Sequence, residues 1–244
     1  MALGAERGGA VLKSAAVLVD GCLQVGLTDT EYRDVLDAAG EIARAGLSHN
    51  SAYEALEVVE IARQFVPVNL SALDTFTLSV VTDLTALRAR LTPGQRIALA
   101  GLAREVGWEY PEESSQTPAA GGLSDLLNGA EIAIYTLTEN AGRQAKQNLL
   151  EEAPGVRVEL NHEHGGSSSL AALAVRADLF VIAWASAAHA ATDFIREKRG
   201  KKSIVYAAGK GAASIVRAVE DWARGEAGHH GGEDDRRPET ALAR

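Results

Sequence analysis

The sequence predicts a two-part α/β protein, with an N-terminal all-helical bundle followed by a C-terminal Rossmann-like domain that holds a four-stranded parallel sheet. In the first half, apolar side chains recur every three or four positions, as they do along one face of a helix. In the last third, four short apolar runs each give way to an amphipathic helix. Strands that alternate with helices in this way are typical of a parallel sheet covered by its crossover helices.

Changes in composition divide the chain of 244 residues into four segments. A stretch with prolines, paired glycines and no periodicity predicts a linker between the two domains. The C-terminal tail is charged, rich in glycine and nearly free of large apolar side chains, so we expect it to be disordered. The predicted segments are a helical bundle at 1–108, a linker at 109–124, the α/β domain at 125–224 and the tail at 225–244.

Five helices are expected in the bundle, near 10–24, 29–45, 50–65, 71–90 and 93–107. Three of their starts carry a capping pair, in which an oxygen-bearing side chain accepts from the opening amides and a polar side chain three positions later reaches back. No dense cluster of catalytic or ligating groups lies on these helices, so we expect them to pack together or to contact a partner. The capping pairs are Thr28 with Glu31, Ser71 with Asp74 and Thr92 with Gln95.

Four strands are expected in the second domain, at 132–135, 156–160, 178–182 and 203–206. The loops that follow parallel strands converge on one edge of the sheet, and ligands bind in the crevice there. The loops of this chain are rich in polar residues, so we expect a ligand at that edge. The candidate ligand-binding residues are Thr138, Asn140, Arg143, His162, His164, Ser186, His189, Gly209, Lys210, Gly211 and Ser214.

The loop after the fourth strand, Gly209-Lys210-Gly211, is the clearest candidate for binding an anion. Glycines at a strand-to-helix turn let the backbone approach an anion, and the opening helix amides add positive potential. Lys210 contributes a full positive charge. The same glycines would also serve any tight turn, so phosphate or carboxylate binding is a hypothesis here.

The loop after the second strand holds His162, Glu163 and His164, whose alternating positions would direct both imidazoles to the same side of an extended segment. A shared metal is one interpretation, but a third ligand is not obvious, so hydrogen bonds to the loop or to a ligand are preferred. After the third strand, Ser186 and His189 lie three positions apart. Here we expect Ser186 to cap the next helix and His189 to contact the ligand.

The composition narrows the possible partners and the setting. A formal net charge of -9 argues against non-specific attraction to nucleic acid or to an anionic membrane. One basic cluster stands out and is interpreted as a solvated surface, with a protein or nucleic-acid contact as the alternative. The lone Cys22 and the lack of a long apolar run predict a cytoplasmic protein without a membrane span. The basic cluster consists of Arg196, Lys198, Arg199, Lys201 and Lys202.

Residues 131–222 resemble a family of small bacterial Rossmann-like domains of uncharacterised function. Two stretches carry the resemblance. One is the strand Asp178-Leu179-Phe180-Val181-Ile182 followed by His189, and the other is Gly211-Ala212-Ala213-Ser214-Ile215-Val216-Arg217-Ala218. The resemblance implies a Rossmann-like fold and a ligand pocket, and it implies no activity, because none is established for that family.

The leading functional interpretation is a non-enzymatic binding or regulatory protein that senses a small anionic ligand, for instance a nucleotide. The helices would then pass that state to a protein partner or to a second copy. One alternative is a hydrolase acting on a phosphoester or a nucleoside-type compound through His162, His164 and His189. Another is an interaction subunit of a bacterial defence assembly. The sequence identifies no cofactor.

Overall fold

The computed structural model describes residues 2–108 and 122–225, with side chains from residue 8 onward. The first part is helical, as predicted, and its helices begin and end within a few residues of those expected, except that the first helix begins at Ala2 rather than near residue 10. Two further single turns follow α2 and α4, at His49–Ser51 and Arg88–Arg90. The five helices are α1 (Ala2–Gln24), α2 (Asp29–Gly46), α3 (Ala52–Arg63), α4 (Leu70–Ala86) and α5 (Pro93–Glu105).

Two of the three predicted capping pairs are confirmed, and the third is wrong. Thr28 with Glu31 caps α2, and Thr92 with Gln95 caps α5, each as a complete capping box. The cap of α4 is Asn69, whose side chain accepts a hydrogen bond from the Ala72 amide at 2.9 Å. Asn69 has an extended backbone, whereas Ser71 already lies inside the helix, so the cap sits two residues earlier than predicted.

The second part is an α/β region with a four-stranded parallel sheet in the order β2-β1-β3-β4. Each predicted strand is present: the first ends at the expected residue, and the other three end one residue later than expected. The short helix α6 was not predicted; its Leu123 and Leu127 are buried and belong to the core. The elements are α6 (Leu123–Leu127), β1 (Glu131–Tyr135), α7 (Glu139–Glu152), β2 (Arg157–Asn161), α8 (Ser168–Arg176), β3 (Leu179–Ala183), η3 (Trp184–Ser186), α9 (His189–Arg199), β4 (Ile204–Ala207) and α10 (Ala212–Ala223).

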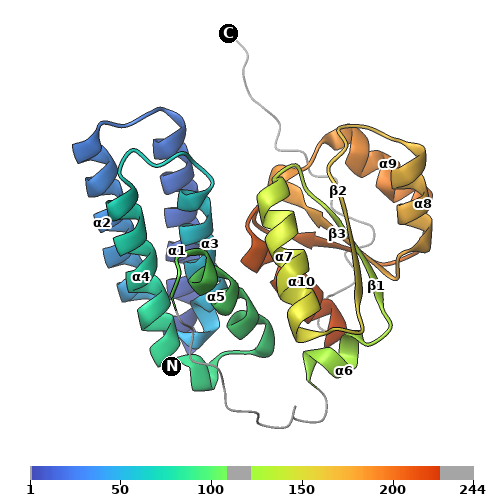
Figure 1. Ribbon diagram of the computed structural model, residues 1–244, viewed down its shortest axis with the longest axis horizontal. Coiled ribbons are helices and arrows are strands. Elements are labelled where there is room, and N and C mark those ends of the chain that lie inside the picture. The colour runs from blue at the N-terminus through green and yellow to red at the C-terminus, as the bar shows by residue number, and fades with distance from the viewer. Residues whose placement is uncertain (1, 109–121, 226–244) are drawn as a thin grey trace.

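The helical region and the α/β region are packed against each other through α7 and α10, which cover one face of the sheet (Figure 1). On the other face lie α8 and α9. Alternate strand residues separate accordingly, since Ile132 and Val181 join the core shared with the helical region, whereas Ala133 and Phe180 pack under α8 and α9. The apolar core of the bundle therefore continues across α10 to the sheet.

The predicted linker falls largely on 109–121 and the predicted tail on 226–244, which lie outside the described residues. Within the described part of the chain, no helix combines the length and the apolar character that crossing a membrane requires.

The basic cluster at the end of α9 is solvated only in part, and the prediction is wrong for Arg199. This side chain is 3% exposed. Its guanidinium donates to the carbonyls of Ala174, Ala177, Asp178 and Ser203, so it joins the end of α8 to the amino ends of β3 and β4. Burial lowers the pKa of Arg199 to about 10, and the Asp178 carboxylate acts in the opposite direction. The local sequence does not predict the burial of Arg199, because its four carbonyl partners lie in other segments or in the turn that follows α9.

Candidate functional site

The loops that follow β1 and β3 are joined at the point where the strand order reverses. The amide of Leu137 donates to the Ser186 carbonyl at 2.8 Å, and the hydroxyls of Thr138 and Ser186 lie 2.7 Å apart. The expected capping role of Ser186 is wrong, because the N-cap of α9 is Ala188 and makes no side-chain cap. Ser186 instead fastens one sheet-edge loop to the other.

The Gly209-Lys210-Gly211 loop faces the helical region, and its amides donate hydrogen bonds to a carboxylate of that region. Glu57, on α3, accepts hydrogen bonds from the amides of Lys210 at 2.9 Å and Gly211 at 3.2 Å. The Lys210 ammonium group pairs with Asp20 of α1 at 2.7 Å. Ser214 accepts from the Gly209 amide and so closes the turn from within.

A second glutamate of α3 caps the start of α10. Both carboxylate oxygens of Glu60 accept from the Ala213 amide, at 2.9 and 3.0 Å. A Cβ atom at position 211 would lie 2.1 Å from Glu60 Oε2, so glycine is required there for the carboxylate to approach. The amides that the sequence predicts to hold an external anion are thus donated to carboxylates of the chain itself. External anion binding at this loop stays a prediction, and such an anion would have to displace Glu57 and Glu60.

Burial raises the pKa of Glu60 well above its ordinary value of 4.5, and the neighbouring Glu57 carboxylate raises it further, whereas the Ala213 amide lowers it. Burial also raises the pKa of Glu57, against the amides of Lys210 and Gly211. Two glutamates in one buried contact are therefore easier to hold when a proton is shared between them.

We expect the stability of the protein to fall as the pH rises above 4.5, because the folded-state pKa of Glu60 is raised. A group with a raised folded-state pKa contributes fully below its unfolded value, and that contribution is lost as the pH rises through the folded value. Glu60→Gln removes this titration and should flatten the loss. The measurement is the melting temperature of both proteins between about pH 5 and pH 8.

The matched control is Glu41→Gln, which removes an exposed glutamate from α2 and should leave the pH profile of the wild type in place. Parallel profiles for the wild type and Glu60→Gln would contradict the assignment, since Glu57 and Glu105, whose pKa values burial also raises, would then account for the pH dependence near this contact.

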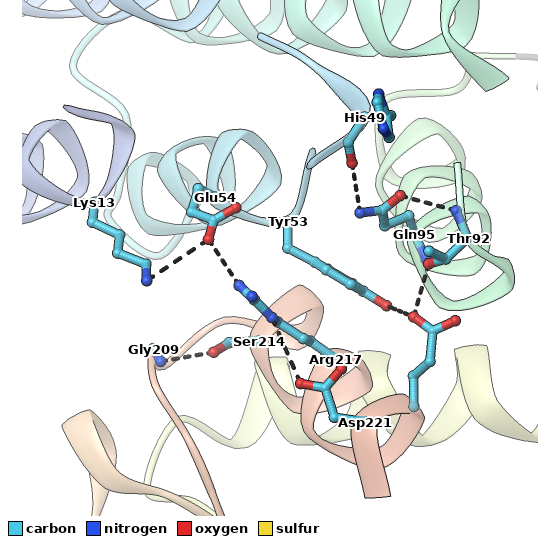
Figure 2. A network of polar contacts seen from close by, with 11 residues as sticks. Lys13, His49, Tyr53, Glu54, Thr92, Gln95, Gly209, Ser214, Arg217 and Asp221 are labelled. Carbon is cyan, nitrogen blue, oxygen red and sulfur yellow. Dashed lines mark hydrogen bonds and ion pairs between the residues drawn. The ribbon is translucent and has the colours of Figure 1, made fainter. Parts of the chain in front are cut away.

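A network of polar contacts extends the same interface along α3, α5 and α10 (Figure 2). Glu54 accepts from Arg217 of α10 at 2.8 Å and lies 3.8 Å from Lys13 of α1. At the other end, the Tyr53 hydroxyl donates to Glu220 at 2.6 Å. Three glutamates of α3, spaced three apart on a largely apolar helix, therefore face the α/β region. The spacing of these glutamates is visible in the sequence and could have suggested a polar interface, but their partners are known only from the structure.

A cleft of about 990 Å³ opens beside this interface, between the helical region and α7. One wall comes from the ends of α3 and α5, and the other from the β1–α7 loop and the first three turns of α7. Four of the predicted ligand-binding residues line it, namely Thr138, Asn140, Arg143 and Gly211. The structure therefore brings part of the predicted site into a real cavity, on the side of the sheet that faces the helices.

The walls of the cleft are polar, and several of their donors have no partner. The side-chain amide nitrogens of Gln64, Gln144 and Asn148 are buried and make no hydrogen bond. Three guanidinium groups also line the cleft, each paired with an acid: Arg63 with Asp74 and Glu105, Arg104 with Glu151, and Arg143 with Glu139. Sequence reasoning missed all of these residues except Arg143, because they gather from three helices.

The other predicted residues lie outside the lining of this cleft. His162 approaches Glu139, a cleft residue, with 3.8 Å between Nε2 and Oε1. His189 packs edge-on against Trp184 on the far face, with ring centroids 6.1 Å apart. The described residues contain no group of three or more histidine, cysteine, aspartate or glutamate side chains arranged to hold a metal. Seven predicted residues are not in the lining: His162, His164, Ser186, His189, Gly209, Lys210 and Ser214.

One comparison with known proteins gives a match, and that match includes the helical half of the chain. No curated protein and no solved structure matches it. The resemblance to small Rossmann-like domains implied a Rossmann-like fold, and a parallel four-stranded sheet is present. The family match described next also includes the helices that precede this sheet. A family model described as DpdD-like matches residues 1–218, nine-tenths of the length, and the chain therefore belongs to the DpdD-like family.

Proposed function

We propose that this protein is a binding and regulatory subunit of a Dpd DNA-modification and defence system, and that a small anionic ligand binds in the cleft between α7 and the helical region. Membership of the DpdD-like family supports the first half of the proposal. The second half is supported by the cleft, whose volume of about 990 Å³ suits a ligand of nucleotide size.

The observation that carries the ligand proposal is the set of unpartnered amide donors in the cleft. Asn148 is 1% exposed, yet its Nδ2 has no hydrogen-bond acceptor. Gln64 and Gln144 have the same unpartnered nitrogen. An unsatisfied buried donor costs about 1–3 kcal/mol, so a ligand rich in acceptor oxygens would recover that cost. Phosphate and carboxylate groups are such ligands.

The charge of the cleft favours an anion. The first turn of α7 lies at the cleft, and its N-cap residue, Thr138, makes no side-chain cap, so the amides of that turn keep their positive potential. Three arginines and three glutamates line the walls. Burial raises the pKa of Glu60 and of Glu105, the latter against the Arg63 guanidinium, so these two carboxylates oppose an anion less than fully solvated ones would.

Such a ligand would contact α3, α5 and α7 together, because residues of all three line the cleft. Binding would therefore strengthen the contact between the helical region and the α/β region. Ligand binding in the cleft would then change the affinity of the helical region for a protein partner, because both would depend on the contact between the two regions. Roles for His162, His164, His189 and Lys210 remain predictions for a ligand that extends along the sheet edge.

The test is a thermal-shift titration with inorganic phosphate and a panel of nucleoside mono- and triphosphates. A compound present at about 100 times its Kd should stabilise the protein by about 2.7 kcal/mol, which is several degrees for a chain of this size. Arg143→Ala should weaken binding of that compound several-fold, because Arg143 lies at the start of the second turn of α7 and lines the cleft.

Arg157→Ala is the matched control, since Arg157 is an exposed arginine at the opposite, amino-terminal end of β2. The proposal fails if no phosphate-bearing compound stabilises the wild type, or if Arg143→Ala and Arg157→Ala bind equally well. Incubation of each stabilising compound with the protein, followed by product analysis, separates a sensor from the alternative hydrolase.

A further inference from the structure

An exposed group of rings and one guanidinium lies on the face of the sheet that points away from the helical region. We call it the aromatic platform, and it consists of Trp184, His189, Arg196 and Tyr206. Trp184 follows β3 directly and is 48% exposed. Tyr206 lies on the edge strand β4, and the other two residues lie on α9. Tyr206 packs in part against the core of this face, but the cleft described above is on the opposite face, so the ligand proposal does not explain this group.

The four side chains hold one another in fixed positions. Trp184 packs edge-on against Tyr206, with ring centroids 5.8 Å apart, and against His189. The Arg196 guanidinium lies 5.5 Å from the Tyr206 centroid and 6.0 Å from that of Trp184, and its Nε donates to the Tyr206 hydroxyl at 2.7 Å. A large ring that is half exposed yet held on three sides is suited to stacking on a flat partner, because little conformational freedom is lost on contact.

Positive charge gathers toward the end of α9 and in the turn after it, beginning at Arg196 of the aromatic platform, although the chain as a whole is acidic. Residues 189–202 contain five lysines and arginines and two acids, for a local net charge of +3 against -9 for the whole protein. Arg199 is buried, but Arg196, Lys198 and Lys201 are exposed or partly exposed along α9 and the turn after it. Asp193 pairs with Arg196 at 3.7 Å and Glu197 pairs with Lys198 at 2.8 Å, and the local charge of +3 already counts both of these acids.

We propose that the aromatic platform binds single-stranded nucleic acid, with an unpaired base stacked on Trp184 and the neighbouring phosphates near Arg196 and Lys198. Rings that accept a base face, beside cations that follow the backbone, are the two elements that single-strand binding requires. The net charge excludes strong non-specific attraction over the whole surface, and it leaves this local positive region as the place where a polyanion can approach.

The test measures fluorescence anisotropy of a labelled single-stranded oligonucleotide of about 12 nucleotides, titrated with the full chain at low salt. Trp184→Ala should weaken binding about tenfold, and Trp184→Phe should retain most of the affinity because it keeps a ring. Arg196→Ala should lower the slope of log affinity against log salt by about 0.7, the value for one single-strand phosphate contact. Oligonucleotide should also quench tryptophan emission less in Trp184→Phe than in the wild type.

Trp108→Ala is the matched control, because Trp108 is also exposed, at 38%, but follows α5 at the other side of the molecule. It should bind like the wild type. The proposal is overturned if the wild type does not bind the oligonucleotide, if duplex of the same length binds equally well and Trp184→Ala changes nothing, or if Trp184→Phe loses as much as Trp184→Ala. These outcomes are independent of the cleft, whose test uses other residues and other probes.

Discussion

Replacing Glu220 by alanine is expected to lower the free energy of unfolding by about 3 kcal/mol or more. Glu220 is buried on α10 and accepts hydrogen bonds from the Tyr53 hydroxyl at 2.6 Å, the Thr92 hydroxyl at 2.8 Å and the Gly94 amide at 3.2 Å. Alanine would remove the charged acceptor of these donors at an interface that water does not reach. The measurement is urea unfolding followed by circular dichroism.

The Tyr53 hydroxyl lies beside the Thr92 hydroxyl as well as the Glu220 carboxylate, in a close contact with α5. Tyr53 is buried, and a Cβ atom at position 94 would lie 2.2 Å from its hydroxyl, so the backbone of α5 already approaches as closely as glycine allows. Burial, together with the Glu220 carboxylate, raises the pKa of Tyr53 well above its ordinary value, so the hydroxyl remains a donor at neutral pH. Loss of Glu220 therefore removes the charged acceptor of this buried O–H and leaves it with only the neutral Thr92 hydroxyl beside it.

Asp221→Ala supplies the control on the same helix. Asp221 is the next residue along α10, is more than a third exposed and pairs with Arg217 at 3.8 Å (Figure 2). An exposed ion pair of this kind contributes about 0–1 kcal/mol, so its loss should be small. Equal destabilisation by the two substitutions would mean that Glu220 acts only as a surface charge, and the interface would need another explanation.

The secondary structure could be predicted because it depends on residues that are close together in the sequence. The capping pairs of α2 and α5 use residues three apart, and the four strands appear as short apolar runs, so each can be read within a window of a few residues. The cap of α4 was mispredicted because Asn69 and Ser71 are both good N-cap residues. Only the backbone conformation decides between them, and the local sequence does not reveal it.

The contacts between the two halves were beyond sequence reasoning, because their partners are far apart in the chain. Glu57 and Lys210 are 153 positions apart, and neither residue carries a local sign of the other. The sequence predicts that the amides of the glycine-rich loop donate to an anionic ligand. In the structure, glutamates of α3 accept from these amides. The neighbouring cleft is lined by the ends of α3 and α5 and by the start of α7, and the spacing of apolar residues within each helix does not predict that these helices lie together.

Arg199 shows the same limit and gives the second large expected effect. Arg199→Met should lower the free energy of unfolding by about 3 kcal/mol or more, since methionine fills much of the space but donates to none of the four carbonyls that the guanidinium satisfies. Urea unfolding followed by circular dichroism measures the change.

Lys201→Met is the control for Arg199→Met, because Lys201 belongs to the same basic cluster but is exposed, and its loss should stay within about 0.5 kcal/mol. Arg199→Lys should fall between the two, since an ammonium group keeps the charge but lacks the planar fork that reaches two sides of the site. If Arg199→Met and Lys201→Met unfold at the same urea concentration, the guanidinium does not hold α8 to the starts of β3 and β4, and the buried arginine would be replaceable by an apolar side chain of similar size.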